Sequence, residues 1–317
     1  MNAVSAGPVR TLAAYGITHA EAVEAIQRAA ARDGIPLEEI HIEDPATSPR
    51  RDRYAQYLWQ KRQRKGLSHQ EAGSRLMNPT YFALAMVACG DADAMVGGST
   101  THYPETLRPA LEVVGAHPKA GIVSGMYMLV FDKHVVFCGD TTVNIDPTAE
   151  QLAQIGYAAS RIVRNFGMVP RIAMLSFSNF GSVRHPESQK VAQAVQLLRR
   201  RDPSLDVDGE MQADTALDAQ ILGAYSFSSL KEPANVLIFP NLSAGNIAYK
   251  LLTHLGGATA IGPILVGMAR PVHVLEYGAD VQEIVNMAAV AVIDAQGRGL
   301  TSTETARTAG HKPGGAL

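Results

Sequence analysis

The chain has 317 residues, of which 46% are hydrophobic and 18% charged, and its formal net charge is −2. This composition excludes a disordered chain and provides enough residues for one large or two ordinary domains. The near-neutral charge gives no electrostatic basis for binding nucleic acid or membrane surfaces, and no apolar run is long enough to span a bilayer. Cys89 and Cys138 lie in apolar surroundings without metal-ligand spacing, which predicts reduced core residues of a cytoplasmic protein. A disulfide between strands remains the alternative.

The N-terminal part of the chain is predicted to begin with a helix. Thr18-His-Ala-Glu21 has the spacing of a capping box, and apolar residues follow on one helical face. A short strand is predicted over 40–42 and a second helix over 53–65. The last turn of that second helix is basic, which suits the negative end of a helix dipole. We interpret this basic run as a solvated helix end, with a phosphate-facing patch as the alternative.

A glycine-rich turn follows the next predicted strand. A capping box at Ser68–Glu71 and an apolar helix over 81–89 lead into a strand at 94–96 and then into the turn Gly97–Thr100. A strand, a glycine-rich turn and a helix together can hold an anion with backbone N–H groups. Tight turns of this kind need glycine in any case, so the signal is weak alone. Arg108, near the start of the next helix, is either a surface residue or an anion ligand.

Strands and helices alternate regularly from Asp146 onward, after a hairpin predicted over 121–131 and 135–142. This alternation predicts a mostly parallel α/β sheet with right-handed crossovers, and we place a domain boundary near Asp146. Residues 297–317 lack periodicity and are predicted to be disordered. The predicted strands cover 171–177, 235–240 and 264–266, and the predicted helices cover 146–162, 186–200, 214–222, 243–256 and 281–295.

Three loops are expected at the carboxyl edge of that sheet, where open α/β folds bind ligands. The loop Ser176–Ser182 offers hydroxyls, an amide and N–H groups suited to a phosphorylated ligand, although a capped loop without a ligand is the simpler interpretation. The loop Pro240–Asn246 contains Ser243, which can equally be a helix N-cap. The third loop lies within 262–278 and begins with the apolar run 264–266, typical of a buried parallel strand.

The sequence gives no support to nicotinamide, nucleotide or metal chemistry within this chain. It contains no dinucleotide fingerprint on a strand-to-helix turn, no P-loop and no zinc motif. Four acidic residues occur close together, but their spacing does not match a calcium loop. We interpret them as the acidic start of a helix and predict no metal site. These residues are Asp206, Asp208, Glu210 and Asp214.

Eight short segments, in order along the chain, resemble the phosphotransacetylase family. The resemblance runs from about Gly16 to Gln296, and so many segments in order make it specific. The segments are Asp44-Pro-Ala-Thr-Ser48, Asn78-Pro-Thr-Tyr81, Gly90-Asp-Ala-Asp-Ala-Met95, Thr106-Leu-Arg-Pro-Ala-Leu111, Asp208-Gly-Glu-Met-Gln-Ala-Asp214, Phe239-Pro-Asn-Leu242, Gly245-Asn-Ile-Ala-Tyr-Lys250 and Gly262-Pro-Ile264.

The resemblance implies two α/β/α domains around a cleft, with mostly parallel sheets and an architecture like that of isocitrate and isopropylmalate dehydrogenases. It implies a first domain of 1–145 plus 263–296 and a second domain of 146–262. It also implies homodimers, acetyl-CoA or CoA as the ligand with no covalently bound cofactor, and acetyl transfer between CoA and inorganic phosphate.

A narrower resemblance points to the C-terminal phosphotransacetylase-like domain of hybrid NADP-dependent malic enzymes. It rests on Ser178-Asn-Phe-Gly-Ser182, Pro271-Val-His-Val-Leu275 and Ile284-Val-Asn-Met287. In those proteins this domain follows a malic catalytic domain, which is absent here, and is thought to sense acetyl-CoA rather than convert it.

The chain departs from active transferases at the centre of the implied site. Those enzymes carry Asp-Leu-Ser-Arg-Gly where this chain has Val274-Leu-Glu-Tyr-Gly278, so Glu276 and Tyr277 replace a serine and an arginine. Glu283 falls where the family has an acidic residue near this site. Because Glu276, Tyr277 and Glu283 all differ from the residues of active transferases, we assign no catalytic residue. The ligand-binding residues implied by the resemblance are Arg108, Ser124, Ser178, Asn179, Gly181, Ser182, Asn246, Arg270, Glu276, Tyr277 and Gly278.

These observations favour an acetyl-CoA-binding, dimerising regulatory domain of an NADP-dependent malic enzyme that lacks transferase activity. Its expected partners are a second copy of the chain, acetyl-CoA and the malic catalytic domain of the parent protein. An active phosphate acetyltransferase and an oligomerisation module without a ligand remain the alternatives.

Overall fold

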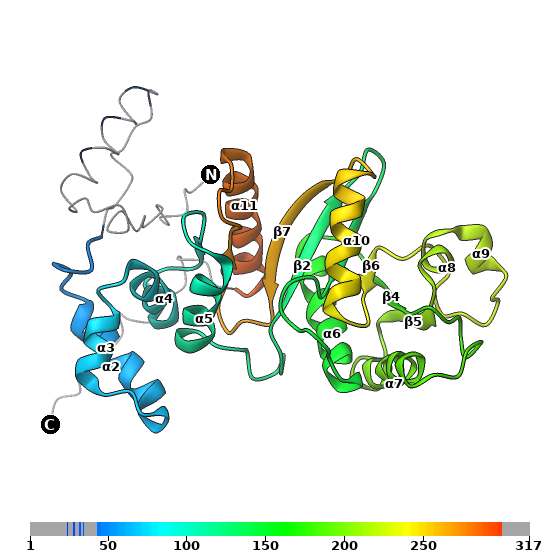
Figure 1. Ribbon diagram of the computed structural model, residues 1–317, viewed down its shortest axis with the longest axis horizontal. Coiled ribbons are helices and arrows are strands. Elements are labelled where there is room, and N and C mark those ends of the chain that lie inside the picture. Colours follow the sequence, from blue (N-terminus) through cyan, green and yellow to red (C-terminus); the bar gives the residue numbers. More distant parts are fainter. Residues whose placement is uncertain (1–23, 25–27, 29–31, 33, 35–42, 300–317) are drawn as a thin grey trace, which may run out of the picture. The chain divides into compact units, whose positions relative to one another are not determined.

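The computed structural model describes residues 24, 28, 32, 34 and 43–299 (Figure 1). The chain divides into two compact units. The first comprises Met1–Gly115, Arg270–Ala279 and Ala291–Leu317, and the second comprises Ala116–Ala269 and Asp280–Val290. Most of the helix predicted after Thr18 lies outside the described residues, but the residues of it that are described, Glu24, Arg28 and Arg32, are helical as predicted. The strand predicted over 40–42 and residues 300–317 of the predicted tail lie outside the described residues. No helix in the described part of the chain is long and apolar enough to cross a membrane.

The helices of the first unit begin and end where local side chains and glycines satisfy their backbone groups. The capping box predicted at Ser68 is confirmed, because Ser68 and Glu71 exchange hydrogen bonds at the start of α3. Asn78 caps α4, whose first residue is Pro79, and Gly90 ends it at φ +82°. The helices are α2 (Arg51–Arg62), the 3₁₀ helix η2 (Gln63–Lys65), α3 (His69–Arg75), α4 (Pro79–Cys89) and α5 (Tyr103–Val113).

Two short parallel strands carry the loops of interest in the first unit. Strand β1 (Met95–Gly97) pairs with β8 (Val272–Val274), in a register that places Val96 opposite His273. The turn after β1 must pass close to β8, since a Cβ on Gly98 would lie 2.9 Å from the carbonyl oxygen of Leu275. Gly98 also has φ +106°, a conformation that side chains disfavour. The predicted strand at 94–96 is therefore confirmed, whereas the sequence did not indicate β8.

The second unit is built on one six-stranded sheet with the order β5-β4-β6-β3-β2-β7. The pairs β5–β4, β4–β6 and β6–β3 are parallel, and the pairs β3–β2 and β2–β7 are antiparallel. The sheet is therefore mostly parallel, as predicted. The strands are β2 (Ser124–Val130), β3 (Val135–Gly139), β4 (Arg171–Leu175), β5 (Asp206–Met211), β6 (Val236–Ile238) and β7 (Thr259–Val266).

The apolar run 264–266 is buried as predicted, but the expectation of a parallel strand there is wrong. These residues end β7, which pairs with β2 in the antiparallel sense. Because β2 is itself antiparallel to β3, β7 points in the same direction as β3, β6 and β4. Its carboxyl end therefore lies at the same edge of the sheet as theirs.

The boundary between the units differs from the one expected near Asp146. The predicted hairpin is confirmed as β2 and β3, but β3 pairs with β6, with Phe137 opposite Val236, so the hairpin belongs to the sheet of the second unit. That unit therefore begins at Ala116. Residue periodicity identifies a hairpin but carries no information about which sheet it joins.

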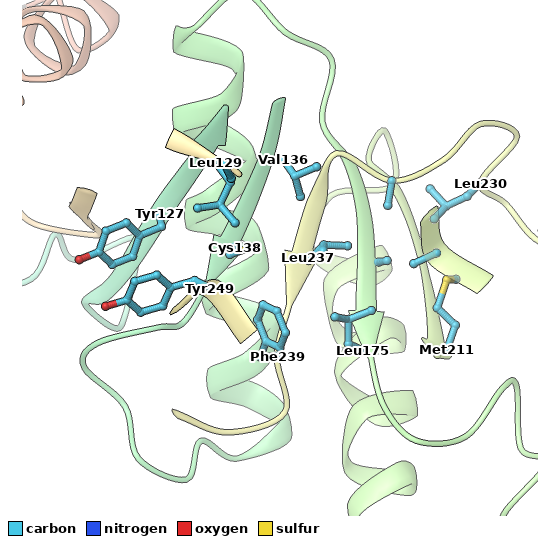
Figure 2. Close-up of a cluster of buried hydrophobic side chains, with 14 of the residues drawn as sticks. Tyr127, Leu129, Val136, Cys138, Leu175, Met211, Leu230, Leu237, Phe239 and Tyr249 are labelled. Atoms are coloured by element: carbon cyan, nitrogen blue, oxygen red, sulfur yellow. The ribbon is translucent and has the colours of Figure 1, made fainter. Parts of the chain in front are cut away.

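Helices cover both faces of the six-stranded sheet. Gly156 of α6 (Ala149–Asn165) lies against Leu198 of α7 (Pro186–Arg201) and Met174 of β4, which places these helices on one face. Helix α10 (Leu242–His254) packs on the other face, where Tyr249 stacks on Tyr127 of β2 at 4.1 Å between ring centroids. Figure 2 shows these two rings side by side, at one end of a cluster that includes Cys138, Leu175, Leu237 and Phe239. The remaining helices are α8 (Ala213–Leu217), α9 (Ala219–Gly223) and α11 (Val281–Gly297).

The acidic residues from Asp206 to Glu210 do not start a helix, so that interpretation is wrong. They lie on β5, where Asp208 and Glu210 are buried, and the helix begins only at Ala213. Aspartate, glycine and glutamate are disfavoured in strands, so local sequence opposed this assignment. Parallel pairing with β4 overrides that preference, because specific partners satisfy the buried carboxylates.

Candidate functional site

The first unit places the loop after β8 against the turn after β1. The Leu275 N–H donates to the Gly97 carbonyl at 2.8 Å, and the Gly278 N–H donates to the Ser99 carbonyl at 2.9 Å. These two bonds continue the β1–β8 pairing beyond the strand ends. They hold Glu276 and Tyr277 at the carboxyl edge of the parallel pair, where the sequence predicted ligand-binding residues.

Tyr277 stacks on His102, which is the N-cap residue of α5. The two ring centroids are 5.3 Å apart with an interplanar angle of 23°, and Tyr277 remains 64% exposed. His102 makes no side-chain hydrogen bond to the start of the helix. The phenol therefore occupies the surface beside the positive end of α5 and adds no charge of its own.

Two arginines of the first unit lack carboxylate partners among the described residues. Arg108 lies on α5 and is exposed, and Arg270 is half-buried just before β8. Burial raises the pKa of Tyr57, and the positive charge of Arg270 partly offsets that effect. Both guanidinium groups are thus available to an anionic ligand.

Glu283 serves as a helix cap. Its Oε2 accepts the Asp280 N–H at 2.8 Å, and its own N–H donates to Asp280 Oδ1 at 2.8 Å, at the start of α11. This reciprocal pair is a capping box formed by Asp280 and Glu283. The carboxylate at this position is therefore already used to cap the N-terminus of α11.

The second unit brings Ser178, Gly181 and Ser182 together around the buried carboxylate of Glu210. Oε1 of Glu210 accepts the Ser178 hydroxyl at 2.9 Å and the Gly181 N–H at 2.6 Å. Ser178 and Ser182 share a hydroxyl hydrogen bond at 3.2 Å. Glu210 thus occupies the position that an anionic ligand of this loop was expected to take.

Every backbone N–H from Ser178 to Val183 has an acceptor inside the chain. The acceptors are the hydroxyls of Ser176, Ser178 and Ser182, the carbonyls of Asn179 and Glu210 and the Glu210 carboxylate. Asn179 is further tied to Gln212, since its Nδ2 donates to Gln212 Oε1 at 3.0 Å and its Oδ1 accepts the Gln212 N–H at 2.7 Å. The loop is therefore closed on itself and on the end of β5.

The loop after β3 is organised by Asp140, which the sequence did not single out. This buried carboxylate accepts the N–H groups of Gly125, Thr142, Val143 and Asn144 at 2.8–3.1 Å. Such convergence of N–H groups on one anion fixes the loop tightly. The loop therefore has a defined shape at the carboxyl edge of β3.

Asn246 and Ser124 both lie next to this Asp140 loop. Asn246 of α10 donates through Nδ2 to the Thr141 carbonyl at 3.2 Å. Ser124 begins β2 and is 1% exposed, and its hydroxyl has no hydrogen-bond partner among the described residues. Among the predicted residues of the second unit, Ser124 thus has a buried hydroxyl without a partner in the described part of the chain.

Glu210, Gln212, Asp140 and His102 are the interacting residues that sequence reasoning missed. The segment Asp208–Asp214 was noticed for its resemblance but interpreted as a helix start, which hid the role of Glu210. Asp140 lies inside the strand predicted over 135–142, whereas β3 ends at Gly139 and Asp140 begins the loop that follows it. No group of three or more metal-ligating side chains occurs within residues 43–299.

Comparisons with known proteins agree with this fold. A sequence model of the family described as phosphate acetyl/butaryl transferase matches residues 8–292. The chain therefore belongs to this family. A phosphotransacetylase structure from Streptococcus pyogenes superposes with a TM-score of 0.81 at 31% identity, covering 87% of this chain and 84% of that one.

Two full-length relatives carry different names. A phosphate acetyltransferase of Nitratidesulfovibrio vulgaris is 39% identical over 264 residues, which are 83% of this chain and 38% of that protein. An NADP-dependent malic enzyme of Escherichia coli is 40% identical over 266 residues, which are 83% of this chain and 35% of that protein. The chain thus spans little more than a third of either protein.

Proposed function

We propose that this chain is an acetyl-CoA-binding, dimerising regulatory domain of an NADP-dependent malic enzyme and that it has no transferase activity. Family membership supports acetyl-CoA or CoA as the ligand, since the family acts on acyl groups carried by CoA. The similarity to malic enzymes supports a catalytic domain of that kind as the partner in a cytoplasmic parent protein. The resemblance noted in the sequence supports a homodimer.

The observation that carries the proposal is the pair Glu276–Tyr277. Where active family members place a serine and an arginine, this chain has a carboxylate followed by a phenol that stacks on His102. Phosphate attack on a thioester develops negative charge, which fixed donors must stabilise. Removing one such donor costs about 10²–10³ in rate, and a carboxylate at the same place repels phosphate as well.

Two further contacts favour binding without chemistry. Glu283 accepts the Asp280 N–H at the start of α11, so a proton transfer by this carboxylate would compete with its capping bond. In the second unit, the N–H groups of the Ser178 loop are taken up by acceptors within the chain. Arg108 and Arg270, which have no carboxylate partner within the described part of the chain, supply cations for the phosphates of CoA.

The proposal is tested by measuring binding and turnover on the same preparation. Isothermal titration with acetyl-CoA is expected to give saturable binding, while acetyl phosphate formation from acetyl-CoA and phosphate stays at background. Light scattering is expected to give twice the chain mass. No binding at millimolar acetyl-CoA would contradict the proposal and favour a ligand-free oligomerisation module.

An active phosphate acetyltransferase is the second candidate, and the observation that favours it is Arg108, which pairs with no carboxylate among the residues described. Arg108 lies in the segment Thr106–Leu111 that resembles the family, and its exposed side chain can hold a phosphate group. Steady acetyl phosphate formation that is lost in Arg108→Ala would establish this candidate instead. The same substitution in a non-catalytic protein is expected to weaken only acetyl-CoA binding.

A further inference from the structure

Three aromatic rings from two separate segments meet on the surface of the second unit. Phe180, in the loop after β4, lies 4.9 Å from Tyr225 and 5.0 Å from Phe227 between ring centroids, and Tyr225 and Phe227 are 5.8 Å apart. The two contacts of Phe227 are edge-to-face. Phe227 is 70% exposed, so much of its ring faces solvent. We call these three residues the aromatic group.

The backbone is strained to position the first of these rings. Phe180 has φ +49° and is the one non-glycine residue at positive φ among the described residues. A glycine would adopt this conformation without the cost that a side chain incurs, and Gly181 follows directly. Strain of this kind persists where a side chain is needed at a defined place. Here the Phe180 side chain packs against the core cluster and supports Phe227.

A lysine ammonium group lies at the turn that carries Phe227. Nζ of Lys231 donates to the Ser228 carbonyl at 2.6 Å and to the Ser226 carbonyl at 3.5 Å, and these two residues flank Phe227. Lys231 has no carboxylate partner among the described residues. The turn therefore presents an aromatic face next to a positive charge.

The nearby carboxylates are already neutralised by other groups. Asp208 is buried and holds Arg199, while its other oxygen accepts the Ser228 hydroxyl at 2.9 Å and the Ser229 N–H at 2.7 Å. Glu232 pairs with Arg171 at 3.4 Å. The charge of Lys231 is thus left to act on a ligand.

We propose that the aromatic group and Lys231 bind a phosphorylated adenosine, with the adenine ring on Phe227 and a phosphate at Lys231. If the proposed function holds, this ligand is the phosphoadenosine end of acetyl-CoA, and the inference rests on that function for its identity. A flat purine matches an exposed aromatic face, and stacking of a base on such a ring contributes about 1–3 kcal/mol. The adjacent ammonium group supplies the charge that a phosphate requires.

The test is titration calorimetry of the whole chain with adenosine 3′,5′-bisphosphate, acetyl-CoA and S-acetylpantetheine. Phe227→Ala is expected to weaken the two adenosine ligands by about 5- to 150-fold and to leave S-acetylpantetheine unchanged. Lys231→Gln is expected to weaken the same two ligands and to reduce the salt dependence of their binding. Val169→Ala removes an equally exposed apolar side chain from the same unit and is the matched control.

The outcomes separate this inference from the proposed function. Equal affinities of Phe227→Ala and Val169→Ala for both adenosine ligands would overturn the adenosine site and leave acetyl-CoA binding intact. Absence of acetyl-CoA binding in the unsubstituted chain would overturn the proposed function, while binding of adenosine 3′,5′-bisphosphate alone would still support the site. A change of oligomeric state in Phe227→Ala without a change in nucleotide affinity would identify a protein contact and overturn the inference. Circular dichroism confirms that each variant is folded.

Discussion

The imidazole Nε2 of His273 lies 3.6 Å from Oδ2 of Asp294, and both side chains are almost completely buried. Asp294 is already paired with Arg298, whose Nε and one terminal nitrogen each donate to it at 2.8 Å. The imidazole nitrogens have no hydrogen-bond partner among the described residues. His273 belongs to β8, so this relationship ties the strand that leads to Tyr277 to α11.

Folding stability is expected to fall in mild acid because of His273. Burial lowers the pKa of His273 to about 4, with Arg298 acting in the same direction and Asp294 opposing both. As the pH falls, His273 therefore becomes protonated near pH 6.5 in the unfolded chain but only near pH 4 in the folded chain. The free energy of unfolding is therefore unaffected by His273 above pH 6.5. It decreases as the pH falls from 6.5 toward 4, and this one group accounts for a loss on the order of 3 kcal/mol.

Urea unfolding at pH 7, 5.5 and 4.5 measures this dependence. The variant His273→Phe is expected to show a flatter profile over the window, whereas His102→Gln, at an exposed histidine of the same unit, keeps the steep one. Equal slopes in His273→Phe and the unsubstituted chain would rule out His273 as the cause.

Gly98→Ala is expected to disturb the loop that carries Tyr277. The new Cβ would lie 2.9 Å from the Leu275 carbonyl oxygen and 3.0 Å from a Val274 methyl group, on a backbone at φ +106°. Crowding of this kind lowers the free energy of unfolding by about 1–3 kcal/mol. Gly90→Ala is the matched control, because Gly90 also has positive φ but has nothing within 4 Å of an added Cβ.

Thermal unfolding of the two variants separates crowding from backbone strain. Gly98→Ala should unfold at a lower temperature than Gly90→Ala and should also bind acetyl-CoA more weakly. Similar melting temperatures for the two would mean that the β1–β8 contact tolerates a methyl group.

Glu210→Ala is expected to lower the free energy of unfolding by about 3 kcal/mol. The substitution leaves the Ser178 hydroxyl and the Gly181 N–H without their acceptor, and hydrogen bonds to a charged group contribute about 1.5–3 kcal/mol each. Glu210→Gln retains an oxygen of the same reach and is expected to lose less than half as much. Denaturant unfolding of the three proteins checks this order, and equal losses in Ala and Gln would show that charge alone matters.

The double substitution Glu276→Ser and Tyr277→Arg is expected to raise acetyl phosphate formation at least tenfold above background. It removes a repelling carboxylate and supplies a hydroxyl and a fixed positive charge, and one such donor is typically worth about 10²–10³ in rate. Glu276→Gln with Tyr277→Phe is the control, because it removes the charge of Glu276 without adding a cation. A double variant no faster than this control would place the cause of inactivity elsewhere in the chain.

The sequence predicted elements well where strong local signals agreed. The capping box at Ser68 and the apolar helix over 81–89 depend on residues only a few positions apart, and the structure confirms both of them. Strand β8 was missed because three residues carry no measurable periodicity. Strand β5 was misassigned because its acidic residues are stabilised by distant partners such as Arg199.

For the candidate site, too, the sequence predicted what depends on neighbouring residues and missed the contacts between residues that are far apart in the chain. The sequence identified the Ser178 loop and the Tyr277 loop as segments of interest. It could not show that Glu210 faces the Ser178 loop, since that depends on the register of β5 against β4. The His102–Tyr277 stack likewise joins residues that are far apart in the chain and adjacent only once β1 and β8 pair.

The pairing of Met95 with Val272 also determines when the Tyr277 loop can form during synthesis and folding. Nearly the whole second unit, Ala116–Ala269, lies between the two strands in the chain. Closing such a long loop is slow and has a large entropy cost, and the strands it joins have only three residues each. We therefore expect the six-stranded sheet to fold first and the β1–β8 pair last. Amide hydrogens of β8 should accordingly exchange with solvent faster than those of β4, by local opening that leaves the rest of the protein folded.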